Sequence, residues 1–255
     1  TAKSLATTQN TINTGLKVSG PKDNGAIYAI AQGMRADVAS YKAVTDSLNR
    51  AISATDTAVS AGEAISDLLS EMKEKALAAS DASIDDNARA AYNEDFVALR
   101  EQIAEVLDAA EFDGVNLIDG STATMAALAN VTAGSVLTVA AQSLSFGGSN
   151  LTLAANGNIS TQSNASTMIS TLSTSIDNLN LALSKLGTAS KKLEIQKTFV
   201  GKLADELNRG IGNLVDADMA TESAKLQALQ TKQQLGVQAL SIANQAPSAV
   251  LGLFR

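Results

Sequence analysis

One run of apolar residues constrains this chain more than any other feature. Between residues 169 and 214, positions recur at spacings that alternate between three and four, and twelve of the fourteen positions are apolar. A repeat of this kind keeps one side of a helix facing a partner helix. It predicts a coiled-coil-like helix about 68 Å long, at ~1.5 Å per residue. We expect its core positions to be Leu172, Ile176, Leu179, Leu183, Leu186, Leu193, Val200 and Leu207.

Two shorter seams of the same kind lie upstream. One runs from Tyr92 to Ala110 and the other from Tyr41 to Met72. Ser83 followed by Asp86 resembles a capping box near the start of the first of these helices. Each seam is explained as the buried face of a helix in a bundle. The sequence therefore predicts a mainly α fold, an elongated rod of long antiparallel coiled-coil-like helices.

The amino-acid composition changes between the second and third helical blocks. No Asp, Glu, Lys or Arg occurs from Gly120 to Ile176. Short strands are predicted at residues 136–139, 144–146 and 151–153, with turns at two Gly-containing pairs. We expect residues 121–165 to form a small β excursion that is peripheral to assembly. Its many Ser and Thr hydroxyls have two explanations that stay open here, strand propensity with solubility or attachment of glycans.

The block from Thr221 to Arg255 is predicted to be helical but of another kind. It is rich in glutamine, and its apolar residues occur all round the helix. Such a helix is buried by partners or fails to form. The charge-free run from Gln233 to Phe254 is long enough to span a bilayer, but its buried amides would be costly in lipid. We therefore predict a self-assembly surface formed by Leu226, Leu229, Leu235, Val237, Leu240, Ile242, Leu251, Leu253 and Phe254.

Composition argues against several other functions. The net charge is −7 and the pI about 4.7, with no cluster of Lys or Arg to bind nucleic acid. The chain has no Cys and no His, which are the usual residues of thiolate chemistry, general-base catalysis and zinc sites. Asp216 and Asp218 are too sparse for a calcium loop. No catalytic, metal-binding or cofactor-binding residue is predicted, and the chain is not expected to be an enzyme.

Four segments resemble a known family. Residues 12–26, INTGLKVSGPKDNGA, are similar to the flagellin pattern in which a helix ends at SGLRINSAKDD. Residues 213–223, NLVDADMATES, resemble the junction IEDADxAxE of the same family. Residues 243–255, ANQAPSAVLGLFR, resemble its terminal ANQxPxxVLxLLR, and residues 112–120, FDGVNLIDG, resemble its loop FNGxxLLDG. The segments follow the family's order, so the chain resembles a bacterial flagellin.

The resemblance implies an architecture. Residues 1–15 and 221–255 would be the terminal helical pair in the filament core, joined by connecting segments 16–28 and 215–220. Residues 29–120 and 166–214 would build the helical rod, and 121–165 the small variable region. Family members usually begin upstream of Thr1, which implies a truncated inner N-terminal helix. Many members carry a receptor-binding arginine on the first rod helix, but residues 69–73 here read LSEMK, so innate immune recognition is not expected.

The function implied by the resemblance is that of a filament subunit for motility. Its partners would be copies of itself, hook-associated junction and cap proteins, and an export chaperone at the C-terminal segment. Its location would be the extracellular flagellum, reached without a cleaved signal peptide, with no membrane insertion. A hook–filament junction protein is the alternative from the same assembly. A glycan-binding surface adhesin is the alternative from another class, although residues 121–165 offer only Phe146 for sugar stacking.

Overall fold

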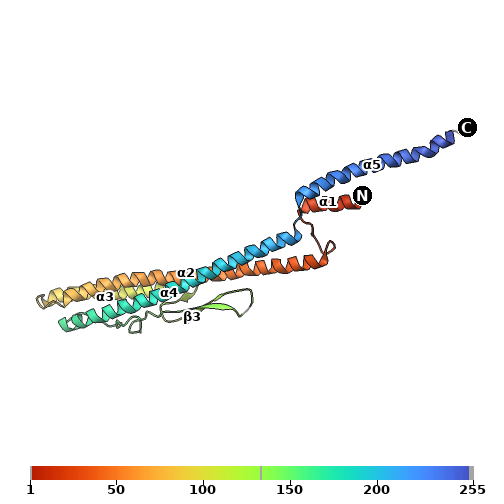
Figure 1. Cartoon of the computed structure of the whole chain (residues 1–255). Helices are drawn as coiled ribbons and strands as arrows, with labels where there is room; N and C mark the ends of the chain where they lie inside the picture. Colours follow the sequence, from red (N-terminus) through yellow and green to blue (C-terminus); the bar gives the residue numbers. More distant parts are fainter. Residues whose placement is uncertain (1, 133, 253–255) are drawn as a thin grey trace. The chain divides into compact units, whose positions relative to one another are not determined.

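The computed structural model describes residues 2–132 and 134–252, with side chains described up to residue 243 (Figure 1). It is mainly α, as predicted, with two small antiparallel sheets. The chain divides into two compact units. The central unit is Ser40–Lys202, and the terminal unit is Thr1–Ala39 with Leu203–Arg255.

Three long helices supply the central unit. They are α2 (Gly25–Ala79), α3 (Asp86–Ala109) and α4 (Gln162–Val215), of which α2 and α4 also extend into the terminal unit. The predicted long helix is confirmed as α4, which begins and ends slightly outside the seam. Figure 1 shows the three helices side by side, and most of their buried apolar residues in the central unit belong to one hydrophobic core.

Side-chain contacts define the helix directions. The Ser190 hydroxyl donates to the Asp56 carboxylate at 2.7 Å, and further along α2 Gly62 lies against Leu183. Residues later in α2 therefore contact residues earlier in α4, so the two helices are antiparallel. Because a short turn reverses the chain between α2 and α3, α3 is antiparallel to α2 as well. It follows that α3 and α4 run in the same direction.

The turn between α2 and α3 is closed by polar contacts. The Asp85 side chain accepts a hydrogen bond from the Ala88 N–H at 2.7 Å and is the N-cap of α3. The predicted capping box of Ser83 and Asp86 is therefore wrong, because the N-cap residue is Asp85 and not Ser83. Arg89 is buried, and its guanidinium donates to the carbonyl of Ala79 at the end of α2. It thereby satisfies a carbonyl that no residue of α2 can bond.

The first sheet is a two-residue hairpin after α3. Strands β1 (Glu111–Phe112) and β2 (Val115–Asn116) are joined by Asp113 and Gly114, which have φ of 52° and 79°. Two successive positive φ values are the requirement of a type I′ turn, which explains the Asp-Gly pair. The buried Asn116 amide donates to the Leu107 carbonyl of α3 at 2.7 Å and thus joins the hairpin to the helix.

The second sheet lies in the charge-free stretch. Strand β3 (Thr124–Leu128) pairs with β4 (Val136–Ala140) in antiparallel register. The strand predicted at 136–139 is confirmed as β4, and β3 was not predicted. Strands at 144–146 and 151–153 are wrong, because these segments form no ladder. The Leu144 N–H bonds instead to the carbonyl of Ile118, outside any strand pair.

The second half of residues 121–165 is not an excursion from the helical core, whereas the expectation that the region is peripheral to assembly stays a prediction. Leu144, Leu151, Leu153 and Ile159 are each at most 1% exposed and belong to the central core. Their apolar spacing reflects insertion of single side chains between helices rather than strand pairing. This segment therefore completes the core around α3 and α4, and the exposed large apolar residues of the region, such as Val136, lie in the β3–β4 hairpin and its turn.

The terminal unit contains the two remaining helices, α1 (Ala2–Thr14) and α5 (Met219–Gly252). A small hydrophobic core is formed there by Val18, Ala31, Ile211 and Val215. Relative to the predicted boundaries, α2 begins at residue 25 instead of 29 and α5 at 219 instead of 221. In both places an Asn or Asp immediately ahead of the helix accepts hydrogen bonds from its first turn, which allows an earlier start.

Candidate assembly surface

Two connecting segments are held together in the terminal unit. Leu16 and Asp216 form an isolated antiparallel bridge. The Lys17 N–H donates to the Val215 carbonyl at 2.8 Å, and the Ala217 N–H donates to the Gly15 carbonyl at 2.9 Å. Gly15 has φ of 71°, the left-handed conformation that commonly ends a helix. The end of α1 and the end of α4 are thus joined through backbone hydrogen bonds.

Carboxylates organise both connections. Asp23 accepts hydrogen bonds from the Ser19 hydroxyl, the Ser19 N–H and the Gly20 N–H, which hold its pKa below the ordinary value of 3.8. Asp218 caps α5 through the Thr221 hydroxyl, the Thr221 N–H and the Ala220 N–H, with the same direction of pKa shift. Both groups remain charged at neutral pH and favour the helix starts that follow them.

Helix α1 packs along the first part of α5, as Figure 1 shows for the red and blue helices. The contact buries Thr8 and Thr11, whereas Leu5 and Ile12 are half-buried. Two buried oxygens, Thr8 Oγ1 and Glu222 Oε2, have no hydrogen-bond partner within the described part of the chain. An unsatisfied buried oxygen is costly, so these atoms mark where a further partner would be favourable.

The exposure of α5 changes along its length. Leu226 and Leu229 are half-buried, but every residue from 231 to 243 is exposed. Leu235, Val237, Leu240 and Ile242 are 59%, 62%, 65% and 71% exposed. At 3.6 residues per turn, Leu235 and Ile242 lie on one side of the helix and Val237 and Leu240 on the opposite side. Two opposite apolar sides cannot both be covered by one neighbouring helix.

The remaining residues of the predicted self-assembly surface lie at the C-terminus. Leu251 belongs to α5, but its side chain is outside the described part of the structure. Leu253 and Phe254 lie outside the described residues altogether.

The predicted rod-core residues fall into three groups. Leu172, Leu179, Leu186, Leu193 and Val200 are at most 1% exposed in the central core. Ile176 and Leu183 are half-buried and pack against that core. Leu207 is half-buried and belongs to the terminal unit, so the structure does not bring it into the same cluster.

Gly62 permits close packing of α2 against α4, a role that was not predicted from the sequence. Gly62 occupies a seam position on α2, and a β-carbon placed there would collide with the Leu183 side chain of α4. The available signal was a glycine in the middle of an apolar seam, which usually has a packing reason. Gly236 of α5 has no atom within 4 Å of such a β-carbon.

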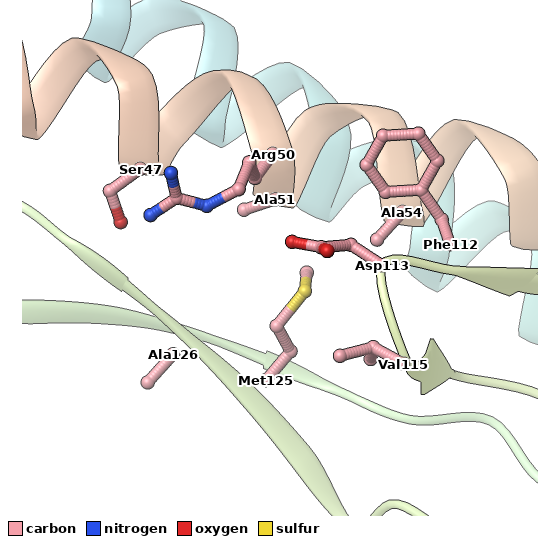
Figure 2. Close-up of a pocket in the computed structure, with 9 residues that line it drawn as sticks. All are labelled: Ser47, Arg50, Ala51, Ala54, Phe112, Asp113, Val115, Met125 and Ala126. Carbon is pink, nitrogen blue, oxygen red and sulfur yellow. The ribbon is translucent and has the colours of Figure 1, made fainter.

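A small cavity lies beside α2 in the central unit (Figure 2). Its volume is about 150 Å³, below the range of roughly 300–1,000 Å³ that is typical of small-molecule sites. Arg50 and Asp113 point into it, and alanines, Met125 and Val115 form much of the wall. Phe112 is its single aromatic residue, which is a poor platform for a glycan.

The described residues contain neither a candidate metal site nor a helix that could span a membrane. No group of three or more Asp or Glu side chains is placed to hold a metal ion. None of the described helices combines the length and apolar character that crossing a membrane would require.

The long helices and the exposed terminal helix are typical of one class of protein. This class is that of structural proteins that are built of long helices and assemble with other chains. Comparison with known families then identifies the member. Residues 1–123 match the bacterial flagellin N-terminal helical region, and residues 154–254 match the bacterial flagellin C-terminal helical region. The chain belongs to the bacterial flagellin family.

Individual relatives agree with this assignment. The chain is 51% identical to flagellin FljK of Caulobacter vibrioides over all of this chain and 92% of the relative. It is 35% identical to a flagellin of Brucella melitensis, over all of this chain and 93% of the relative. A putative flagellar hook-associated protein from Vibrio parahaemolyticus has a TM-score of 0.63 at 11% identity, covering 76% of this chain and all of that chain, and shows the fold alone.

The family determines the general function. The chain is a structural subunit of the extracellular flagellar filament, which forms by self-assembly. The junction-protein and adhesin alternatives are not favoured, because the relatives with high identity are named flagellins.

Proposed function

We propose that helices α1 and α5 are the segments through which copies of this chain pack in the filament core. The observation that carries the proposal is the exposure of every residue of α5 from 231 to 243, with apolar side chains on opposite sides. Covering apolar surface contributes about 25 cal/mol per Å². Covering several such side chains with neighbouring copies would therefore offset part of the conformational entropy that is lost when the helix is ordered.

The two unpartnered oxygens support the same arrangement. Thr8 Oγ1 and Glu222 Oε2 are buried beside α1 and α5 without a hydrogen-bond partner among the described residues. A donor from a neighbouring copy would satisfy Glu222, and a polar group would satisfy Thr8. The glutamines of α5 would likewise bond between copies, which avoids burying unsatisfied amides.

The exposed part of α5 also has a role before assembly. An apolar helix without neighbours is a hazard for aggregation, so it needs cover before it reaches the filament. We propose that an export chaperone binds this C-terminal segment. We further propose that the same terminal pair contacts hook-associated junction and cap proteins at the two ends of the filament, where a neighbouring copy is missing.

The test removes residues 221–255 from the full chain. We expect a folded monomer, judged by circular dichroism and sedimentation, that forms no filaments by electron microscopy at concentrations where the intact chain does. The reason is that the central core lies in Ser40–Lys202 and does not include α5. Filaments of normal appearance from the shortened chain would contradict the proposal.

A second measurement tests order within α5. In a dilute monomer verified by sedimentation, amide hydrogens of residues 231–243 should exchange quickly, because few contacts protect them. In filaments the same amides should exchange slowly. Equally slow exchange in monomer and filament would show that assembly does not order this segment.

A further inference from the structure

Helix α4 carries a second periodic stripe, distinct from its buried seam. Its positions alternate between spacings of four and three, and all are exposed, with Ile195 at 63% and Phe199 at 58%. It contains three lysines and no acidic residue. We call it the basic stripe, and its members are Leu181, Lys185, Thr188, Lys192, Ile195, Phe199 and Lys202.

The surface along the basic stripe is hollowed. One groove of about 440 Å³ lies between Leu137 of β4 and the residues around Lys192 and Ile195. A second groove of about 370 Å³ continues along α4 past Phe199 to Lys202. The rim of these grooves is mostly lysine, with Glu194 as its one carboxylate, and an exposed apolar strip with a charged rim has the composition of a binding surface.

Helix α3 carries an exposed stripe with the same spacing and the opposite charge. It contains four acidic residues and no basic one, and two of its other positions are alanines. We call it the acidic stripe, and its members are Asn87, Ala91, Glu94, Ala98, Glu101, Glu105 and Asp108. The small alanines leave room for larger side chains from a partner.

The charged groups of the two stripes are not used within the chain. Among the described residues, none of the lysines of the basic stripe and none of the carboxylates of the acidic stripe takes part in a salt bridge. Both stripes lie in the central unit, where α3 and α4 run in the same direction. Matching spacing, opposite charge and the common direction of the two helices fit a helix-to-helix contact between two molecules.

We propose that the basic stripe of one copy docks onto the acidic stripe of a second copy of this chain. The contact is heterologous, because it uses a different surface on each molecule. In a pair, one copy keeps its acidic stripe free and the other copy keeps its basic stripe free. With the helices parallel, every copy has the same orientation, and repetition of the contact builds an open assembly. The inference rests on the proposed function and adds a lateral contact that is separate from α1 and α5.

The test uses reversal of charge in the full chain. One variant carries Lys185→Glu, Lys192→Glu and Lys202→Glu, and its counterpart carries Glu94→Lys, Glu101→Lys and Glu105→Lys. Each alone should raise the critical concentration for polymerisation about tenfold or more, since facing attractions become repulsions. The two variants mixed should polymerise with alternating copies, and one chain carrying all six changes should polymerise alone.

Control substitutions separate this contact from charge reversal elsewhere on the surface and from the terminal pair. Lys197→Glu and Glu111→Lys change charge at exposed positions outside the stripes and should leave the critical concentration within about twofold. Circular dichroism and thermal unfolding should be unchanged in every variant. If the intact chain polymerises and the reversed variants do so equally well, the stripe proposal is wrong and the role of α1 and α5 stands.

A second readout does not depend on filaments. At low ionic strength the two reversed variants should associate in sedimentation velocity when mixed but not separately, and added salt should weaken the association by screening. If the chain lacking residues 221–255 still forms filaments and the mixed variants associate, the terminal pair fails and the stripes stand. Absence of association in the mixture, together with normal polymerisation of each variant, would overturn the stripe contact.

Discussion

Helices α4 and α5 are similar in apolar content and differ in where that content is placed. In α4 the seam residues recur at alternating spacings of three and four, and those in the central unit are covered by other parts of the same chain. In α5 the apolar residues follow no such repeat, and those from 235 to 242 are more than half exposed. Periodicity therefore separates a helix that completes its packing within one molecule from a helix that needs several partners.

The largest expected difference between the two regions follows from deletion. Removal of residues 144–159 takes four fully buried side chains out of the central core, so we expect loss of cooperative unfolding by circular dichroism. Removal of residues 231–255 should leave the thermal midpoint of the central unit unchanged, because the described part of that segment is exposed. Shortening only the turn between β3 and β4 should be tolerated, since a surface loop changes length at small cost. A folded chain lacking 144–159 would show that this segment is dispensable.

The same substitution placed in each helix sharpens the comparison. Leu186→Lys puts a charge into a position that is 1% exposed and should cost at least the ~2–5 kcal/mol of a buried Leu→Ala change. The midpoint of thermal unfolding should then fall by roughly ten degrees. Leu235→Lys, at a position 59% exposed in the monomer, should leave that midpoint unchanged and prevent filament formation. A Leu186→Lys midpoint within a degree or two of the original would exclude the seam as a core.

Glycine substitutions should act with opposite signs in the two regions. Gly62→Ala drives a methyl group into Leu183, and overpacking of this kind costs about 1–3 kcal/mol. Gly236→Ala meets no atom within 4 Å and should stabilise its helix by roughly 0.5–1 kcal/mol. Denaturant unfolding measures the first effect, and hydrogen exchange of the monomer measures the second. Stabilisation by Gly62→Ala would mean that α2 and α4 pack less closely than the structure shows.

The smallest expected effect is a pH dependence at the start of α5. Hydrogen bonds from Thr221 and Ala220 lower the pKa of Asp218, so its cap contributes fully at neutral pH. The contribution begins to be lost as the pH falls below the ordinary value of 3.8 and is gone below the lowered pKa. Protection of the amides of residues 220 and 221, measured relative to their intrinsic exchange rate at each pH, should fall over that interval. Asp218→Ala should show low protection already at neutral pH and no further loss, whereas an identical acid response in the variant would assign the effect to another group.

The sequence by itself determined the helices and their grouping. A seam of fourteen positions specifies the length and the buried side of α4. A repeat of this period places apolar side chains along one side of a helix, and that side is stable in water when a partner helix covers it. The terminal motifs determined the family for a similar reason, since they are local strings of residues. The aperiodic apolar content of α5 also pointed to partners outside the chain.

Only the tertiary structure decided the roles of residues that depend on distant neighbours. Leu144, Leu151 and Leu153 have the spacing of short strands, yet they lie in the helical core because helices, not strands, are the nearest surfaces to cover them. The close approach at Gly62 depends on Leu183, far away in sequence. The exposed stripes on α3 and α4 are visible only once burial separates each helix into inner and outer sides. Spacing specifies which residues share a side of a helix, but contact with other elements decides which of those sides meets water.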